Sequence, residues 1–136
     1  MMMKRNDQFN DLENAVMEAF LDGPDEVLRI LRAQYESASL VKRDLSGGGF
    51  FTSFSVSDEA GKLDPPKTFH LGDVEAEIEG LENGAGFELF IVGGCLHTLE
   101  AFTYDESWPA SVVRFKVYYH SGEQRDFESL RRYWKF

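Results

Sequence analysis

The sequence predicts an α+β domain in which two N-terminal helices pack on one face of an antiparallel sheet. Two observations support this. Apolar residues recur at helical spacing over the first third of the chain, and then alternate every second residue between glycine-rich turns. The chain has 136 residues, a size that fits one domain. We therefore expect a single domain over residues 1–136, with residues 1–6 disordered, an αα hairpin, a meander of about six strands and a short C-terminal helix.

The helical part consists of two segments joined by a tight turn. Over residues 7–21, apolar side chains at offsets 0, 3, 7 and 11 from Phe9 form one helical stripe, with Asn6 or Asp7 as its cap. Pro24 then suits the first turn of a second helix, so the two helices should form a hairpin. Near the C-terminus, Asp126 could cap a short helix with apolar residues at 127, 130 and 134.

Alternation with a period of two begins after the second helix and predicts the strands. An exposed loop over 57–67 interrupts it. The run 87–92 is apolar on both faces, which predicts a central strand. The run 74–79 alternates aliphatic residues with Glu, which predicts one wet face. The extended runs are 39–45, 50–56, 68–71, 74–79, 87–92, 95–103 and 111–119.

The charge of the chain is −10, from 24 acidic and 14 basic residues, and it is unevenly placed. Between Lys67 and Arg114, nine acidic residues occur without any Lys or Arg. Because nucleic-acid binding draws its main affinity from cations, this predicts no nucleic-acid partner. An acidic centre would instead steer a basic protein towards it, although acidic surfaces also serve solubility alone.

Several classes of function are disfavoured by what the sequence lacks. No apolar run approaches the ~18 residues of a membrane span, which predicts no membrane partner. The first residues show no apolar run behind their positive charges, and the single cysteine cannot form an internal disulfide; both features favour the cytoplasm. No metal or phosphate-binding motif occurs, so we expect no metal, no cofactor and no catalytic set.

One alternative keeps chemistry open around His70, Cys95 and His97. Cys95 and His97 are two residues apart on a predicted strand, so their side chains could meet as a nucleophile pair. With His70 they mark a possible pocket between sheet and helices, for a small ligand or an unrecognised reaction. The competing interpretation is ordinary packing, because apolar and acidic surroundings raise the pKa of a thiol rather than lower it.

The segment 99–109 crowds three aromatic and three acidic side chains into a strand end and a loop. Exposed rings beside carboxylates suit a basic partner, because Arg can stack on a ring and pair with an acid. The competing interpretation is that the rings pack the end of the sheet while the acids cap the loop. The candidate binding residues are Glu100, Phe102, Tyr104, Asp105, Glu106 and Trp108.

Four short runs form one pattern: Gly86–Phe90, Leu96–Glu100, Phe102–Tyr104 and Trp108-Pro109. The pattern resembles a family of small bacterial proteins, a domain of unknown function, and the likeness covers residues 28–109. The resemblance implies structural roles for these residues and no activity. It also implies a glycine after Leu99-Glu100, where this chain has Ala101.

We therefore expect a non-enzymatic acidic domain that binds a basic protein. Small acidic bacterial α+β proteins include immunity proteins that neutralise toxins, and this chain is similar to them in size and charge. A small-ligand binder or an unrecognised enzyme is the alternative. A homodimer that forms through a sheet edge or the C-terminal rings is a third possibility.

Overall fold

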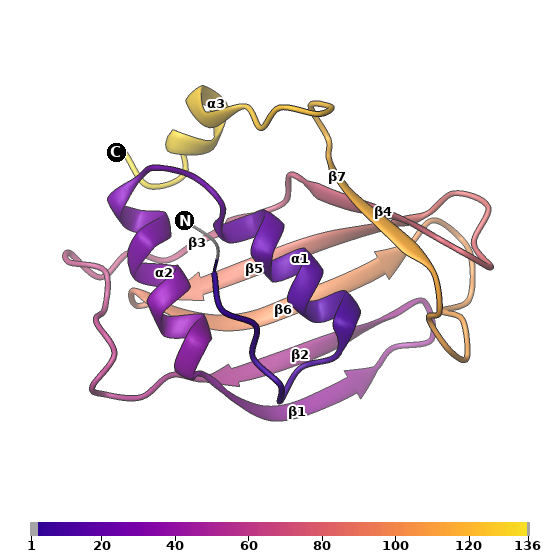
Figure 1. Cartoon of the computed structure of the whole chain (residues 1–136), viewed down its shortest axis with the longest axis horizontal. Helices are drawn as coiled ribbons and strands as arrows, with labels where there is room; N and C mark the ends of the chain where they lie inside the picture. Colours follow the sequence, from indigo (N-terminus) through magenta and orange to yellow (C-terminus); the bar gives the residue numbers. More distant parts are fainter. Residues whose placement is uncertain (1–2, 136) are drawn as a thin grey trace.

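The computed structural model describes residues 3–135, and over these residues the chain forms two N-terminal helices, a seven-stranded sheet and a short C-terminal helix (Figure 1). This confirms the predicted α+β class. The helices are α1 (Asp11–Leu21), α2 (Glu26–Ser37) and α3 (Phe127–Arg131). The strands are β1 (Ser39–Leu45), β2 (Gly49–Ser55), β3 (Phe69–Leu71), β4 (Val74–Ile78), β5 (Ala85–Val92), β6 (Cys95–Thr103) and β7 (Phe115–Tyr119).

The sheet is antiparallel throughout, in the order β1-β2-β6-β5-β4-β7. The short strand β3 also pairs with β5, so β3 and β4 follow one another along the same side of β5, with Gly72 and Asp73 between them. Strand β5 is therefore central, as its apolar composition predicts. The sheet departs from a simple meander, because β6 pairs with β2, β7 pairs with β4, and β3 pairs with β5.

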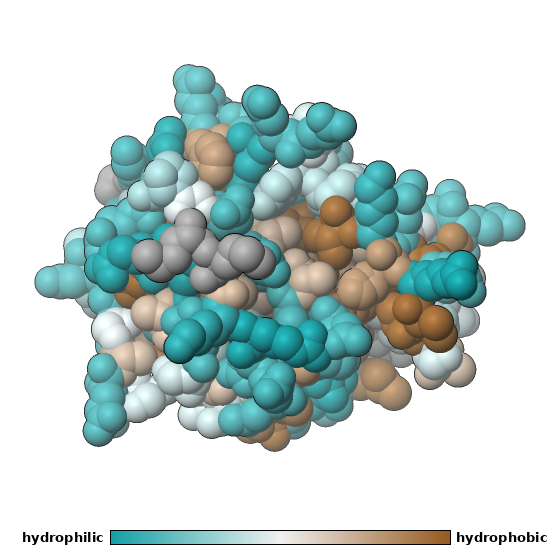
Figure 2. Space-filling model, viewed as in Figure 1, coloured by the Kyte–Doolittle hydropathy of each residue, from teal (hydrophilic) through white to brown (hydrophobic). Residues whose placement is uncertain are grey.

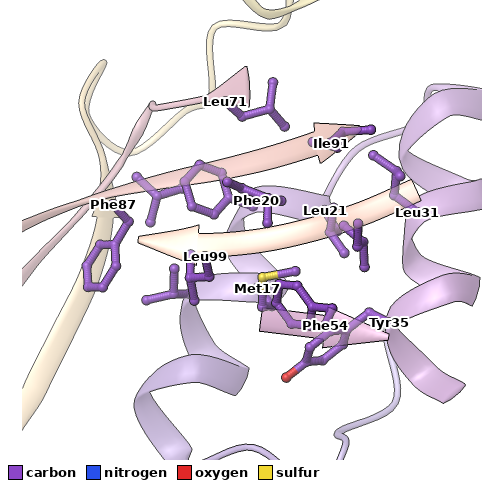
Figure 3. Close-up of a cluster of buried hydrophobic side chains, with 14 of the residues drawn as sticks. Met17, Phe20, Leu21, Leu31, Tyr35, Phe54, Leu71, Phe87, Ile91 and Leu99 are labelled. Atoms are coloured by element: carbon purple, nitrogen blue, oxygen red, sulfur yellow. The ribbon is translucent and has the colours of Figure 1, made fainter. Parts of the chain in front are cut away.

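Helices α1 and α2 lie across one face of the sheet, in front of the strands in Figure 1. Their apolar stripes meet the inward side chains of the strands and form one core, part of which Figure 3 shows. Phe9, Tyr35 and Phe54 add a ring cluster with centroids 5.2 to 6.2 Å apart. Apolar burial of this kind is the main stabilising contribution to a domain of this size.

Helix α1 begins later than the apolar spacing predicts, because Asn10 caps it instead of Asn6 or Asp7. The Asn10 side chain accepts a hydrogen bond from the Glu13 amide at 2.8 Å, and Glu13 accepts one from the Asn10 amide at 2.9 Å. This reciprocal capping box satisfies two amides that the helix itself leaves unpaired.

Glu13 also joins α1 to the sheet. Its carboxylate is fully buried and accepts hydrogen bonds from Arg43 on β1, at 2.9 and 2.5 Å, and from the Thr52 hydroxyl on β2. A buried carboxylate is tolerated only when its charge and its lone pairs are matched in this way.

Residues 1–6 were expected to be disordered, but the structure describes residues 3–6 as part of the fold. Asn6 is buried, and its side-chain amide donates to the carbonyls of Tyr35 and Ala38 at 2.9 and 2.8 Å. Tyr35 lies in the last turn of α2 and Ala38 is its C-cap, so the Asn6 side chain helps to cap the C-terminal end of this helix. Met1 and Met2 lie outside the described residues.

The chain after β6 differs from the predicted strand over 111–119. The ladder with β4 begins at the pair of Phe115 and Ile78, so residues 111–114 form an exposed segment that leads into β7. The predicted C-terminal helix is present as α3, and Asp126 caps it by accepting from the Ser129 amide at 3.1 Å. Two bidentate ion pairs hold this segment, each made through Nε and Nη2 of the arginine: Arg125 with Asp73, and Arg131 with Asp25.

Candidate functional site: the open face of the sheet

The two faces of the sheet differ in what covers them. Inward residues of the strands are buried against α1 and α2, whereas the alternate side chains are half-buried or exposed. Within residues 3–135, both long helices pack on the inward side (Figure 1). We call the other side the open face; its centre consists of Phe51, Glu88, Phe90, Glu100 and Phe102.

Strand register arranges the side chains of the open face in rows across the sheet. The middle row is acidic and includes one ring: Asp44 of β1, Phe51 of β2, Glu100 of β6 and Glu88 of β5. Two further rows flank it. One contains Gly49, Phe102, Gly86, Glu75 and Tyr118, and the other Lys42, Ser53, Thr98, Phe90 and His70.

The carboxylates of these rows are not equivalent. At one edge Asp44 lies 3.3 Å from the Lys42 ammonium, and towards the other edge Glu75 lies 2.7 Å from His120 Nδ1. In the centre, Glu88 and Glu100 stand directly opposite each other on β5 and β6. Like charges in this position repel, so the central pair lowers the stability of the sheet.

The carboxyl group of Glu88 is also partly withdrawn from water. Its side chain is 30% exposed and lies over Gly72, where a Cβ atom would come within 2.7 Å of Oε1. The Oε2 atom is buried without a hydrogen-bond partner, and His70 Nε2 is 3.8 Å away from it. Burial raises the pKa of Glu88 above its ordinary value, and the charge of Glu100 raises it further, while His70 acts in the opposite direction.

Aromatic rings lie beside this acidic pair. Phe102 and Tyr104 meet edge to face at 5.8 Å, and both lie over Gly86. A Cβ atom at Gly86 would be 2.5 Å from Phe102 Cζ and 2.9 Å from the Tyr104 hydroxyl. The missing side chain at position 86 therefore lets both rings lie against the sheet. Burial and then Glu75 raise the pKa of Tyr104, which keeps its hydroxyl protonated.

The structure divides the six candidate binding residues between two regions. Glu100, Phe102 and Tyr104 lie together on or beside the open face. The other three belong to the loop that follows β6: Asp105 is an exposed turn residue with φ of 60°, Glu106 accepts from the amides of Glu82 and Asn83 at 2.8 and 3.0 Å, and Trp108 packs edge-on against Phe50 at 5.2 Å. In the loop, Trp108 therefore packs and Glu106 caps, as the competing interpretation expects. At the end of the strand, Phe102 and Tyr104 are partly exposed rings beside Glu100.

The three residues of the alternative pocket do not form one site. His70 lies on the open face, 5.6 Å from the Phe90 ring. The β5–β6 ladder shifts register at Phe90 and Ile91, so His97 becomes an extra residue, exposed and 2.6 Å from the Thr98 hydroxyl, while Cys95 is half-buried opposite Val92. No hydrogen bond within residues 3–135 joins Cys95 to His97, whose ring nitrogen contacts Thr98 instead. Among the described residues, no group of three or more His, Cys, Asp or Glu could hold a metal ion.

A groove of about 940 Å³ lies elsewhere, between the start of α1, the β1–β2 hairpin and the segment before β7. Hydrophobic side chains gather on this part of the helix-bearing surface (Figure 2). Leu45 and Val113 are 77% and 75% exposed at its rim, and Leu12, Phe50 and Trp108 lie deeper. His70, Cys95 and His97 do not line it, so the groove differs in place from the pocket that the sequence predicts.

Sequence reasoning identified part of the open face and missed Phe51, Glu88 and Phe90. The single polar residue Glu88 within the apolar run 87–92 was the available signal. The Gly93-Gly94 turn predicts that β5 pairs with β6. The register shift inside this hairpin decides that Glu100 lies opposite Glu88, and residue spacing does not reveal that shift.

Comparisons with protein-family models, with curated proteins and with solved structures found no match to this chain. The resemblance of residues 28–109 to a bacterial family therefore stays a prediction. The fold and the site define the class instead: an α+β domain whose sheet has one face covered by helices and one open, acidic and aromatic face. None of the described helices is both long and apolar enough to cross a membrane.

Proposed function

We propose that this chain is a non-enzymatic interaction domain that binds a basic protein through the open face of its sheet. The observation that carries the proposal is the pair Glu88 and Glu100, two glutamates directly opposite each other on strands that contain no Lys or Arg. A partner cation placed between them would offset both their repulsion and the electrostatic cost of the partial burial of Glu88.

The rings around the pair support binding to a protein surface. Aromatic side chains that are partly exposed lose little conformational freedom when a partner covers them, and they are enriched at the centres of interfaces. The net charge of −10 would steer a basic partner to the molecule and speed association at low salt. The same charge disfavours pairing of two copies through this face, because their acidic rows would repel.

In its finer form, the proposal is a cytoplasmic bacterial inhibitor of the immunity type, which blocks a basic toxin by covering its functional surface. Size, acidity and the α+β class support this form by analogy. The coarser proposal does not depend on it.

The test is capture from a lysate of the native host with three forms of the full chain. These are the wild type, the open-face variant Glu100→Gln with Tyr104→Ser, and the control Glu18→Gln with Glu59→Gln, which changes two exposed residues away from this face. We expect a basic protein to be retained at low salt by the wild type and the control, and to be lost by the open-face variant. Hydrogen exchange of the complex should show protection at β4, β5 and β6. Equal capture by all three forms, or protection confined to α1 and α2, would contradict the proposal.

A second candidate function is binding of a small apolar ligand in the groove beside α1. Its volume of about 940 Å³ lies within the range of ligand sites, and its lining combines apolar side chains with a few polar and charged ones. Trp108 lines the groove, so energy transfer from tryptophan to the probe 1-anilinonaphthalene-8-sulfonate should report occupancy. This candidate requires transfer that Leu45→Asp abolishes, and absence of transfer in the wild type would remove it.

A further inference from the structure

We infer that Glu88 and Glu100 form the docking point for a guanidinium group, so that the basic partner is anchored on the open face by an arginine side chain. This inference rests on the proposed function and names the chemistry by which the partner would be recognised.

The geometry around the pair is a partial frame of rings. Directly opposite residues on neighbouring strands have Cβ atoms roughly 4.5–5.5 Å apart. One group above the sheet can therefore reach both side chains once the Glu88 carboxyl group turns from Gly72 towards Glu100. Phe51 stands opposite Glu100 on its other side, while Phe102 and Phe90 lie two residues along β6 and β5 on the same face. On the remaining side lies Gly72, whose missing side chain leaves room for the Glu88 carboxyl group itself.

The charges inside this frame are unmatched by the chain itself. Asp44 and Glu75, farther out, each have a cationic or chargeable neighbour within 3.3 Å, namely Lys42 and His120. For Glu88 the corresponding group is His70, at 3.8 Å and outside hydrogen-bond distance, and one carboxylate oxygen has no hydrogen-bond partner. Because Oε2 is buried against Gly72, an incoming donor would satisfy it only if the carboxyl group turns outward, and the gained hydrogen bond favours that turn.

The frame favours arginine over lysine on physical grounds. A guanidinium group is planar, presents five N–H donors, and can bridge two carboxylates while its face lies on an aromatic ring. It is also less strongly hydrated than an ammonium group, so it loses less when phenyl rings displace its water. A hydrated metal ion would gain nothing from three phenyl rings, and the acid pair supplies only two carboxylates.

The test uses two fluorescent peptides, nona-arginine and nona-lysine, and the full chain at low ionic strength. We expect the wild type to bind nona-arginine about ten-fold more tightly than nona-lysine, the difference of roughly one charge-assisted hydrogen-bond contact. Glu88→Gln with Glu100→Gln should abolish this preference. The control Glu18→Gln with Glu59→Gln removes the same charge from exposed sites elsewhere and should keep the preference. Phe102→Leu, which keeps an apolar side chain without a ring, should reduce the preference without changing nona-lysine binding.

Two outcomes would overturn the inference: equal affinity of the wild type for both peptides, or equal loss of the preference in the acid-pair variant and its control. Thermal melts of each variant separate loss of binding from loss of folding. The proposed function fails separately, if native capture does not depend on the open face. The peptide preference is measured independently of native capture. A failure of the peptide test therefore does not imply a failure of native capture, and the two can be told apart.

Discussion

Glu13 and Glu88 are both withdrawn from water on opposite faces of the same sheet, but the chain treats their charges differently. On the helix-covered face, Glu13 accepts hydrogen bonds from Arg43, Thr52 and the Asn10 amide, so both of its oxygens are matched. On the open face, Glu88 stands opposite a second carboxylate, and its Oε2 atom has no hydrogen-bond partner. The first carboxylate holds elements together, and the second weakens the sheet that carries it.

The difference shows that the two faces of the sheet have different roles. The contacts that join helices to strands are made on one side and are complete within the chain. The other side has charges and rings whose contacts are incomplete. A carboxylate that lowers stability in the free protein, yet is positioned by Gly72 and framed by rings, is what an interaction surface requires. Four measurements can break or sharpen this comparison.

The largest effect is expected from Glu13→Ala. The substitution leaves the Arg43 guanidinium and the Thr52 hydroxyl without their acceptor in a covered site, and it removes half of the capping box. We expect the free energy of unfolding to fall by about 3 kcal/mol, the lower end of the range for a broken buried pair, because Arg43 keeps some access to water. Urea unfolding measures it, with Arg5→Ala in an exposed ion pair as the control. A loss no larger than that of the control would contradict a structural role for Glu13.

Gly86→Ala should destabilise the domain by about 1–3 kcal/mol, since the new methyl group collides with the rings of Phe102 and Tyr104. The rings must turn away from the sheet, which tyrosine fluorescence and methyl chemical shifts would detect. Gly61→Ala is the matched control, because nothing lies within 4 Å of a Cβ atom there. An unchanged ring environment would show that position 86 does not support the aromatic part of the open face.

Glu88→Gln should act in the opposite direction and raise the free energy of unfolding at neutral pH by up to about 1 kcal/mol, because it removes the repulsion from Glu100. The pKa of Glu88 is raised in the folded state, so the folded protein binds this proton more tightly than the unfolded chain. Stability therefore falls as the pH rises above the ordinary value of 4.5 and through the raised pKa. The gain from glutamine should be full at pH 7 and should vanish below about pH 4. Urea unfolding at both pH values tests this, and an equal gain at both would refute the electrostatic explanation.

The smallest effect is expected from His97→Ala, at the register shift of β6. Its ring is exposed and contacts only the neighbouring Thr98 hydroxyl among the hydrogen bonds of the described residues. We expect a change in unfolding free energy within about 0.5 kcal/mol and no change in peptide binding. A large loss in either measurement would revive the pair of Cys95 and His97 as a site.

The sequence predicts the helices and strands well because their periods differ, and the tight turn at Gly93-Gly94 identifies the β5–β6 hairpin. It misplaces the start of α1 by four residues, although Asn10 and Glu13 carry the spacing of a capping box. It also extends the last strand into residues 111–114. These residues alternate in the sequence, but the β4–β7 ladder begins only at Phe115. Residue periodicity determines whether a segment is a helix or a strand, but it does not show which other strand a given strand pairs with.

The candidate site was harder to predict for the same reason. Glu100, Phe102 and Tyr104 could be singled out because they are close together in the sequence. Their neighbours Phe51 and Glu88 come from two other strands, and the order of these strands depends on how the whole sheet assembles. Trp108 and Glu106 share the composition of a binding loop but pack or cap instead, because side-chain direction after β6 is set by the turn at Asp105.

The one-sided arrangement of the helices also has a consequence for adaptation. Residues 51, 88, 90, 100 and 102 project from the open face, whereas the hydrophobic core that stabilises the domain lies on the helix-covered face. Their side chains can be exchanged together, with little risk to the backbone that presents them. A library randomised at these five positions would therefore be expected to yield folded proteins with new binding preferences.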